Sequence, residues 1–576
     1  MQHRRHRLRR APLVLLLLAL VLVLALRSAR RAGWRLEVGG RQPSHNLGSS
    51  EECSSEKAEF LRQHPNYGYH GWIDAHWQEE VGSRMAPGSH YLDFTGSGLY
   101  TNSQLRAASR ELEGSLFGNP HSTNPSSMLS TAELADARAR VLAHFSADPE
   151  EYAVVFVRSA TEALKLVGEY FPWAPRPGWQ PERRVHPGGI SDAAALPAGR
   201  CGTLEQAGTG GAGSSFVYLR ANHKSVLGIG AYAKLHGSTL ACVDEPGMEA
   251  WLASKPPEDD QGAAADDVTY SLVAYPSKDN LEGRMYPLDW IQRVHSRSTD
   301  RHKWMVVLDA AAHVATHPLD LRAVKPDFVC ISFYKIFGLP TGVGALLARR
   351  KSAAALRITY FGGGSVVDAT AEDVWRVLMP LPEGLEAGTP PFLDILQLKH
   401  GFDMLRRLGG MPAIEAHVES LRAWTAPRLA ALRHPGGAPL LRLFGAHGRG
   451  PRVQSGVFAF LVLHANGSSR AAPWVQQDAA AAGLHVRSGC VCNPGQCHYD
   501  VGLRPEEARA RALDGARAGT DDLAPLVTVA RPGADGRPAR VRLAAGVVRA
   551  SLGPLSTFED VCALLEFLRG YRELVL

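Results

Sequence analysis

The stretch Pro-Asp-Phe-Val-Cys-Ile-Ser-Phe-Tyr-Lys-Ile-Phe-Gly, residues 326–338, decides the fold of this 576-residue chain. Its apolar run, residues 328–331, predicts a short buried strand, which delivers Ser332 and Lys335 to a turn closed by Gly338. A lysine directly after a buried strand ordinarily projects into solvent, because lysine is rarely buried. Upstream, residues 305–308 predict a second apolar strand, which ends in the carboxylate of Asp309.

This pairing of a lysine with a carboxylate is typical of a pyridoxal phosphate (PLP) site. A desolvated lysine amine forms a Schiff base with an aldehyde cofactor. An aspartate keeps the pyridine nitrogen of that cofactor protonated, so that the ring accepts electrons. The sequence therefore predicts that Lys335 carries PLP and that Asp309 binds its ring nitrogen.

Composition excludes several classes of protein. The net charge of +6 comes from an arginine-rich N-terminus and from arginines in inserts, with no basic stripe interleaved with aromatic residues, so we expect no nucleic-acid partner. Eight cysteines in so long a chain predict no disulfide framework. Length alone suggests roughly three or four domains, and the low-complexity inserts lower that number.

The N-terminal 50 residues pose a separate question of targeting. Residues 1–10 contain five arginines, and residues 11–26 are an unbroken apolar run. Three functions fit this pattern: the apolar core of a signal peptide, a short membrane anchor that contacts the bilayer, and an organelle-targeting presequence. A wrongly assigned first exon is a fourth explanation. We expect residues 1–50 to lie outside the fold.

From Tyr67 onward the sequence alternates between predicted strands and helices. This alternation predicts a mainly parallel sheet wrapped by helices, hence an α/β fold. We expect a large α/β domain over residues 60–400, with inserts at about 174–215 and 256–267. A smaller α+β domain follows over residues 401–576, with an insert at about 502–540. A long helix after Asp394 is expected to end at Gly409-Gly410.

Further motifs give the chain a family resemblance. Asp309 together with Ser332-Phe333-Tyr334-Lys335 resembles the class V aminotransferase superfamily, which contains the cysteine desulfurases. The flanking sequence is closer still to the desulfurase-like domain of molybdenum cofactor sulfurases. The resemblance extends from about Tyr67 to near the C-terminus, interrupted by inserts. The matching stretches are Tyr91-Leu92-Asp93, residues 118–122, 331–338, 340–342, 361–364, Gly388-Thr389, 392–394, 398–402 and 487–493.

The resemblance implies a fold-type I PLP-dependent transferase that acts as a homodimer, with residues assigned around the cofactor phosphate. Ser159-Ala160-Thr161 lies at a predicted strand-to-helix turn, where backbone N–H groups and the helix dipole favour a phosphate. Ser332 corresponds to a second phosphate ligand. Thr389 corresponds to a threonine that reaches the phosphate across a dimer interface. Many desulfurases have a histidine where this chain has Tyr334.

The same resemblance assigns residues around the cofactor ring. His223 corresponds to the ring that stacks on the pyridine face and that can also move protons. Asn280 corresponds to the residue that hydrogen-bonds the phenolic oxygen. Most desulfurases carry glutamine or histidine three residues after the aspartate, whereas this chain has Ala312 there and His313 next to it.

Two arginines are candidates for binding a substrate carboxylate. Arg549, on a predicted strand, corresponds to the arginine that binds the α-carboxylate of the substrate, and Arg487 is a second candidate. A guanidinium group binds a carboxylate through two parallel hydrogen bonds, which a lysine cannot do.

A cluster of three cysteines carries the second half of the implied chemistry. The Arg-x-Gly-x-x-Cys pattern of related desulfurases places the sulfur-accepting nucleophile on Cys492. Cys490 takes the position usually held by histidine, and Cys497 is a candidate to accept or resolve sulfur. A metal site made by these cysteines and His498 is the alternative, but the usual Cys-x2-Cys spacing is missing, and we favour sulfur relay.

The resemblance implies that the chain converts L-cysteine to L-alanine and holds sulfur as a persulfide on Cys492. The implied acceptor is the molybdenum cofactor; another sulfur carrier is possible, since a further cofactor-binding domain of sulfurases does not follow in this sequence. Two other functions stay open: a general cysteine desulfurase for iron–sulfur or carrier proteins, and a non-catalytic, membrane-anchored scaffold. The family is cytoplasmic, whereas the N-terminal segment points to a membrane or an organelle.

Overall fold

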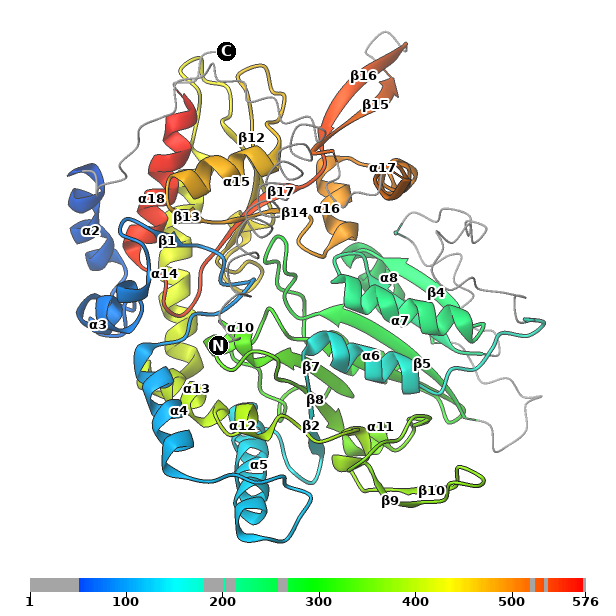
Figure 1. Cartoon of the computed structure of the whole chain (residues 1–576). Coiled ribbons are helices and arrows are strands. Elements are labelled where there is room, and N and C mark those ends of the chain that lie inside the picture. Colours follow the sequence, from blue (N-terminus) through cyan, green and yellow to red (C-terminus); the bar gives the residue numbers. More distant parts are fainter. Residues whose placement is uncertain are drawn as a thin grey trace, which may run out of the picture. The chain divides into compact units, whose positions relative to one another are not determined.

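The computed structural model describes residues 51–180, 201–202, 213–256, 268–517, 524–532 and 537–572, all within one compact unit, Leu47–Leu576 (Figure 1). The predictions on residues 1–50, and on the middle of the first two inserts, therefore lie outside the described residues. Within the described ranges, no helix is both long and apolar enough to cross a membrane.

A seven-stranded sheet forms the centre of the molecule. Its order is β2-β8-β7-β6-β5-β3-β4, in which the five strands from β7 to β4 are parallel and β8 is antiparallel to both of its neighbours. This mainly parallel sheet confirms the predicted α/β fold class. The strands are β2 (Tyr152–Val157), β3 (Ser215–Leu219), β4 (Thr239–Val243), β5 (Thr269–Pro276), β6 (His302–Asp309), β7 (Phe328–Ser332) and β8 (Gly344–Arg349).

Both faces of this sheet are covered. In β2, Val154 and Phe156 pack into one hydrophobic cluster, while Val155 and Val157 pack into another, as the alternation of side chains along a strand requires. Helices α6 (Ala160–Tyr170) and α7 (Lys224–Leu235) lie side by side on the second face (Figure 1). The other helices of this part are α4 (Asn102–Gly114), α5 (Pro125–His144), α8 (Glu245–Ala253), α9 (Trp290–His295), α10 (Phe333–Phe337) and α11 (Arg350–Ala353).

A second, antiparallel sheet is built from the C-terminal part of the chain. Its order is β11-β12-β17-β14, with β12 and β17 in the middle and fully buried. The predicted domain boundary at residue 400 stays a prediction. The elements here are β11 (Leu441–Phe444), β12 (Val457–Val462), β14 (Arg487–Gly489), β17 (Val547–Ser551), α15 (Ala472–Ala481), α16 (Pro494–Val501) and α18 (Phe558–Arg569).

The helical region after Asp394 differs from the prediction. It consists of α12 (Phe392–Ile395), α13 (Leu398–Arg407) and α14 (Gly410–Ala430), the longest of the three. Gly409 has a φ of 92°, a left-handed conformation that glycine adopts without strain. This glycine ends α13 as expected, but it is also the N-cap of α14, which begins at once and packs into the core through Met411, Ile414 and Val418.

The predicted insert at about residues 502–540 contains regular secondary structure in its described parts. Helix α17 (Pro505–Arg517) and the hairpin of β15 (Leu526–Pro532) and β16 (Pro538–Ala544) occupy this region. Val529 and Ala544 are buried in a hydrophobic cluster with Leu461. These apolar contacts are hard to recognise in the sequence, because arginines occupy many of the exposed positions of the hairpin.

The fold also begins earlier than Tyr67. Helices α2 (Glu51–Gln63) and α3 (Trp72–Glu80) precede and follow that residue. Phe60 is fully buried against Trp424 and Phe558, so α2 is part of the core. The remaining strands are β1 (His90–Tyr91), which pairs with β13 (Leu484–His485), and β9 (Val366–Ala369), which pairs with β10 (Arg376–Leu378).

Candidate active site

Lys335 lies in the short helix α10, directly after the buried strand β7. Gly338 ends the helix with a φ of 78°, and a β-carbon there would lie 2.5 Å from the backbone nitrogen of Tyr100, so the close approach of the two segments requires glycine. Burial lowers the pKa of Lys335, and the charge of Asp309 acts in the opposite direction. A lysine with a lowered pKa has more of the neutral amine that attacks a carbonyl group.

Asp309 ends β6, the strand next to β7 in the sheet. The parallel register pairs Asp309 with Cys330, two residues before the end of β7. Its carboxylate is 8% exposed, and Oδ1 accepts a hydrogen bond from the backbone N–H of Ala311 at 3.1 Å. The sheet therefore brings Asp309 and Lys335 to the carboxyl ends of adjacent strands, where ligands bind in open α/β sheets.

A small cavity beside Lys335 contains a second lysine that the sequence analysis missed. Lys278 is buried, donates from Nζ to Oγ1 of Thr316 at 2.7 Å, and lines the same cavity as Lys335 and Ala312. Burial lowers the pKa of Lys278 to about 7. In the sequence, the one indication of a role for Lys278 is that it lies two residues before Asn280, a predicted cofactor contact.

The predicted phosphate ligands converge at the N-termini of α6 and α7. The backbone N–H of Ala160 donates to Oγ of Ser332 at 2.8 Å, and Oγ1 of Thr161 lies 2.8 Å from Oγ of Ser225. Ser159 occupies the N-cap position of α6, but its side chain makes no capping bond. Ser225 was missed, because a serine in the first turn of a helix is common and carries no signal of its own.

His223 occupies the N-cap position of α7. Its Nδ1 accepts a hydrogen bond from the backbone N–H of Ser225 at 3.2 Å, so the proton of the neutral ring lies on Nε2. Burial lowers the pKa of His223, while the charges of Asp309 and Lys335 act on it in opposite directions. The ring is therefore neutral and close to both of these groups.

Asn280 contacts the cysteine loop, and Thr389 lies on the surface of the chain. The Nδ2 of Asn280 donates to the carbonyl oxygen of Val491 at 2.5 Å, which ties it to the cysteine loop. Thr389 is exposed, and none of the hydrogen bonds among the described residues joins it to the other phosphate candidates. A role for Thr389 within one copy of the chain therefore has no support here.

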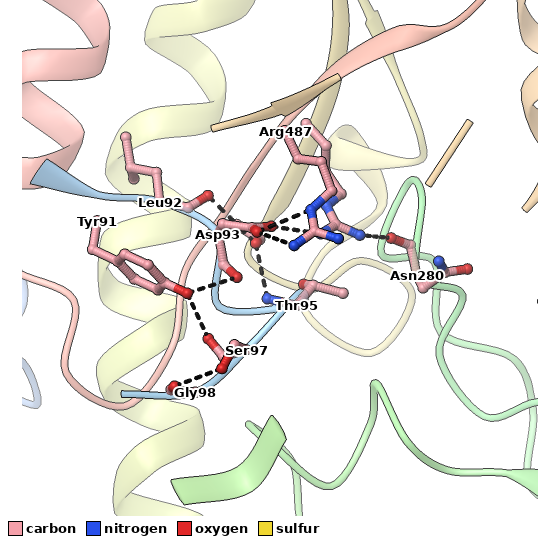
Figure 2. Close-up of polar contacts among 10 residues, drawn as sticks. Tyr91, Leu92, Asp93, Thr95, Ser97, Gly98, Asn280 and Arg487 are labelled. Atoms are coloured by element: carbon pink, nitrogen blue, oxygen red, sulfur yellow. Dashed lines mark hydrogen bonds and ion pairs between the residues drawn. The ribbon is translucent and has the colours of Figure 1, made fainter. Parts of the chain in front are cut away.

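Arg549 and Arg487 lie on adjacent strands and share one carboxylate, that of Asp93 (Figure 2). Oδ1 of Asp93 accepts from Nη2 of Arg549, and Oδ2 accepts from Nη2 of Arg487, both at 2.6 Å. The carbonyl oxygen of Asn280 accepts from Nη1 of Arg549 at 2.7 Å. Nε of Arg549 is buried without a partner. Asp93 was noted in the sequence only as part of a matching motif.

The cysteine loop, residues 490–493, connects β14 to α16. Cys492 is exposed and free, and its carbonyl oxygen accepts from the backbone N–H of Lys224 at 2.7 Å. Both Val491 and Cys492 have positive φ values, 39° and 64°. The bond from Lys224 places Cys492 at the N-terminus of α7, next to the N-cap residue His223.

Disulfides join several of the cysteines, for which the sequence predicted no disulfide framework. Cys490 is bonded to Cys497, and Cys201 to Cys242. In this state Cys497 is buried and has no free thiol with which to accept sulfur, and two of the sulfurs proposed for a metal alternative are bonded to each other. Across the described ranges, no group of three or more metal-ligating side chains is suitably arranged.

Comparisons with known proteins agree with this geometry. The chain is 39% identical over 518 residues to the molybdenum cofactor sulfurase of Bos taurus, covering 88% of this chain and 52% of that protein. It is 37% identical over 496 residues to the molybdenum cofactor sulfurase of Homo sapiens, covering 84% and 50%. The chain thus spans about half the length of these relatives.

A solved structure shows the same fold, and a family model covers just over half of the chain. The apo structure of the cysteine desulfurase from Thermococcus onnurineus NA1 matches with a TM-score of 0.61 at 18% identity, covering 86% of this chain and 98% of that one. The model of the aminotransferase class-V family matches residues 204–510. The chain therefore belongs to the class V aminotransferase family.

Proposed function

We propose that this chain is a PLP-dependent, cysteine desulfurase-type sulfurtransferase, which takes sulfur from L-cysteine onto Cys492 and releases L-alanine. One observation carries the proposal: the loop of the exposed, free Cys492 is hydrogen-bonded to the N-terminus of α7, beside His223, at the same carboxyl edge of the sheet as Lys335. A lysine that binds an aldehyde and a thiolate that accepts sulfur need this proximity, because both act on the same substrate.

The residues at the strand ends suit PLP. The hydroxyl of Ser159 is not used for capping, and Ser332, which accepts the N–H of Ala160, keeps its own hydroxyl proton to donate. The hydroxyls of Thr161 and Ser225 lie at the N-termini of α6 and α7, where a phosphate is favoured. Asp309 offers a carboxylate for the pyridine nitrogen, and His223 offers a flat neutral ring. When bound, the cofactor supplies an electron sink that stabilises negative charge on the substrate carbon.

Arg549 suits the α-carboxylate of an amino acid. Its buried, unpartnered Nε–H is a donor that has lost its water and has gained no protein acceptor, which is costly unless a ligand occupies it. Arg487, which is partly exposed on the same side, adds positive charge. A carboxylate there would place the substrate between Lys335 and the cysteine loop.

Cys492 is suited to the transfer step because it is exposed and reduced. Its thiolate forms a bond to the sulfur of L-cysteine while the carbon–sulfur bond breaks. The electron pair of that bond stays on carbon, which takes up a proton to give L-alanine, and the sulfur leaves as a persulfide on Cys492. No external oxidant or reductant is needed.

We propose the molybdenum cofactor as acceptor of this sulfur, supported by the names of the similar proteins of Bos taurus and Homo sapiens. We also propose that the chain acts as a homodimer in which Thr389 of one copy reaches the phosphate of the other. Exposed apolar side chains between residues 360 and 378 suit such a contact. They are Tyr360, Val367, Val374, Trp375 and Val377.

An absorbance spectrum of the protein lacking residues 1–50, with PLP supplied, tests this function. We expect a visible band of lysine-bound cofactor that changes on addition of L-cysteine, release of alanine, and a persulfide mapped to Cys492. Protein that takes up no PLP would refute the proposal. Sulfur transfer to molybdenum cofactor, compared with transfer to an apo iron–sulfur protein, identifies the acceptor, and light scattering gives the oligomeric state.

A further inference from the structure

Asp93 joins two arginines that would otherwise repel each other. β14 and β17 are antiparallel, and their register places Arg487 directly opposite Arg549. Side chains opposite each other on one face of a sheet lie about 5 Å apart at their β-carbons, and like charges at such a pair are destabilising. The carboxylate of Asp93 lies between the two guanidinium groups, with one oxygen bonded to each (Figure 2).

The backbone around Asp93 fixes the position of this carboxylate. The N–H of Leu92 donates to the carbonyl of His485, and the N–H of Ser551 donates to the carbonyl of Leu92 at 2.6 Å. The N–H of Thr95 donates to Oγ of Ser551 at 3.0 Å. The backbone on both sides of Asp93 is therefore hydrogen-bonded to β13 or β17, the strand that carries Arg549.

The turn after Asp93 packs closely against the ion pair of Asp93 and Arg487. A β-carbon at Gly96 would overlap Oδ2 of Asp93 and Nη2 of Arg487. Glycine at this position lets the chain pass directly over the ion pair. The pair is thus enclosed by the turn on one side and by the strands on the other.

The side chains of Arg549, Asp93 and Arg487 differ in solvent exposure, and from this difference we infer which ion pair matters more. The side chain of Arg549 is 2% exposed, that of Asp93 14%, and that of Arg487 48%. A buried guanidinium is strongly destabilised unless a carboxylate neutralises it, whereas an exposed ion pair contributes little. The bond from Asp93 to Arg549 therefore matters most, and Arg487 completes the charge balance at the rim.

Asp93 and the Asn280 carbonyl each take one terminal nitrogen of Arg549, and Nε remains without a partner. Two arginines and one aspartate leave a net charge of +1, which one substrate carboxylate neutralises. We propose that Asp93 is a positioning residue that fixes the orientation of Arg549 for binding the α-carboxylate of the amino-acid substrate. This inference rests on the proposed function and deepens it.

The test compares Asp93→Asn and Asp93→Glu with the parent protein, all loaded with PLP. The readout is the absorbance change with L-cysteine and with cysteamine, which lacks the carboxylate. For Asp93→Asn we expect the half-saturating L-cysteine concentration to rise about 10- to 100-fold, while that of cysteamine changes less than about threefold. Asp93→Glu keeps the charge and should recover part of the loss.

Two outcomes would overturn the proposal. If Asp93 instead competes with the substrate for Arg549, Asp93→Asn lowers the half-saturating L-cysteine concentration. If Asp93 has only a general structural role, L-cysteine and cysteamine shift equally. Asp136→Asn is the matched control, because Asp136 makes an exposed ion pair with Arg140 on the surface of α5, and no shift is expected.

Two further measurements keep the proposal testable if Asp93→Asn folds poorly or if the proposed function fails. Gly96→Ala crowds the ion pair without changing its charge, and we expect a smaller rise for L-cysteine alone. In cofactor-free protein, modification by phenylglyoxal should reach Arg549 faster in Asp93→Asn than in the parent, with exposed Arg487 modified in both. Unchanged protection of Arg549 would refute the positioning role, whatever the response to L-cysteine.

Discussion

The strand ends around Lys335 and the cysteine loop around Cys492 are held in position by different interactions. Lys335 and Asp309 follow strands in the middle of a sheet that is buried on both faces, so their positions are fixed by packing. The cysteine loop is tied to the central sheet region by two hydrogen bonds to its carbonyl oxygens, from Asn280 and Lys224. It also contains two non-glycine residues with positive φ.

This difference fits the two tasks. A cofactor needs groups that do not move, because its ring must keep one orientation through the reaction. A cysteine that takes sulfur from a buried substrate and gives it to a separate acceptor needs a segment that can leave its position. Cys490 is fixed to α16 by its disulfide to Cys497, so the part of the loop that can move is Val491 and Cys492, which are released when the bonds from Asn280 and Lys224 open.

Removing the lysine should have the largest effect. Lys335→Ala takes away the amine that binds the cofactor, so we expect the visible band to disappear and alanine formation to fall by roughly a thousandfold or more. Borohydride reduction followed by mass spectrometry of the parent should find the cofactor on Lys335. Lys278→Ala is the matched control and should retain the band. Cofactor found on Lys278 instead would contradict the assignment.

Removing the thiol of Cys492 should abolish persulfide formation without affecting the cofactor site. Cys492→Ser keeps the cofactor site intact, so we expect an unchanged visible band, no persulfide, and alanine formation reduced by about a hundredfold or more. Cys330→Ala removes the other described free thiol, which is buried, and should leave persulfide labelling unchanged. Persulfide that persists in Cys492→Ser would place the acceptor elsewhere.

A buried carboxyl group beneath the loop should make stability depend on pH. Gln496 of α16 contacts both Glu282 and Asp500, and burial raises the pKa of Glu282. Between about pH 4.3 and about pH 9, the folded protein therefore holds a proton on Glu282 that the unfolded chain has released. The free energy of unfolding falls as the pH rises through this range. We expect Glu282→Gln to remove this loss.

Chemical denaturation at pH 5 and pH 8 measures this effect. The stability of Glu282→Gln relative to the parent should increase with pH, by at most about 1.4 kcal/mol per unit. An equal gain at pH 5 and pH 8 would show that Glu282 is ionised in the folded protein at both pH values.

The smallest effect concerns the backbone of the loop. Val491 has a φ of 39°, a conformation that costs a residue with a β-carbon roughly 1–2 kcal/mol and costs glycine little. Val491→Gly and Val491→Ala both lose the contacts of the two valine methyl groups, and the glycine variant loses only the small contribution of Cβ in addition. We therefore expect the glycine variant to be more stable than the alanine variant by about 1 kcal/mol. Equal denaturation midpoints, or a more stable alanine variant, would show that the loop carries no such strain.

Local patterns predicted the parts of the site that follow directly from strands. The apolar runs before Lys335 and Asp309 were correctly identified as β7 and β6, and the turn at Ser159 as the start of α6. The hairpin of β15 and β16 was missed, because arginines at its exposed positions hide the buried Val529 and Ala544. The immediate start of α14 after Gly409 was missed because a glycine that ends one helix carries no information about the next.

The sequence by itself determined the strand–helix alternation and the lysine–aspartate pair, because periodic burial and a catalytic motif are local properties of the chain. Only the tertiary structure decided that Asp93 lies between Arg487 and Arg549, that Lys278 shares the cavity of Lys335, and that Cys490 is bonded to Cys497. The first two contacts join residues far apart in the chain, and their partners are chosen by sheet register and by packing. The disulfide between Cys490 and Cys497 depends on the backbone conformation of the cysteine loop, which hydrophobic periodicity does not predict.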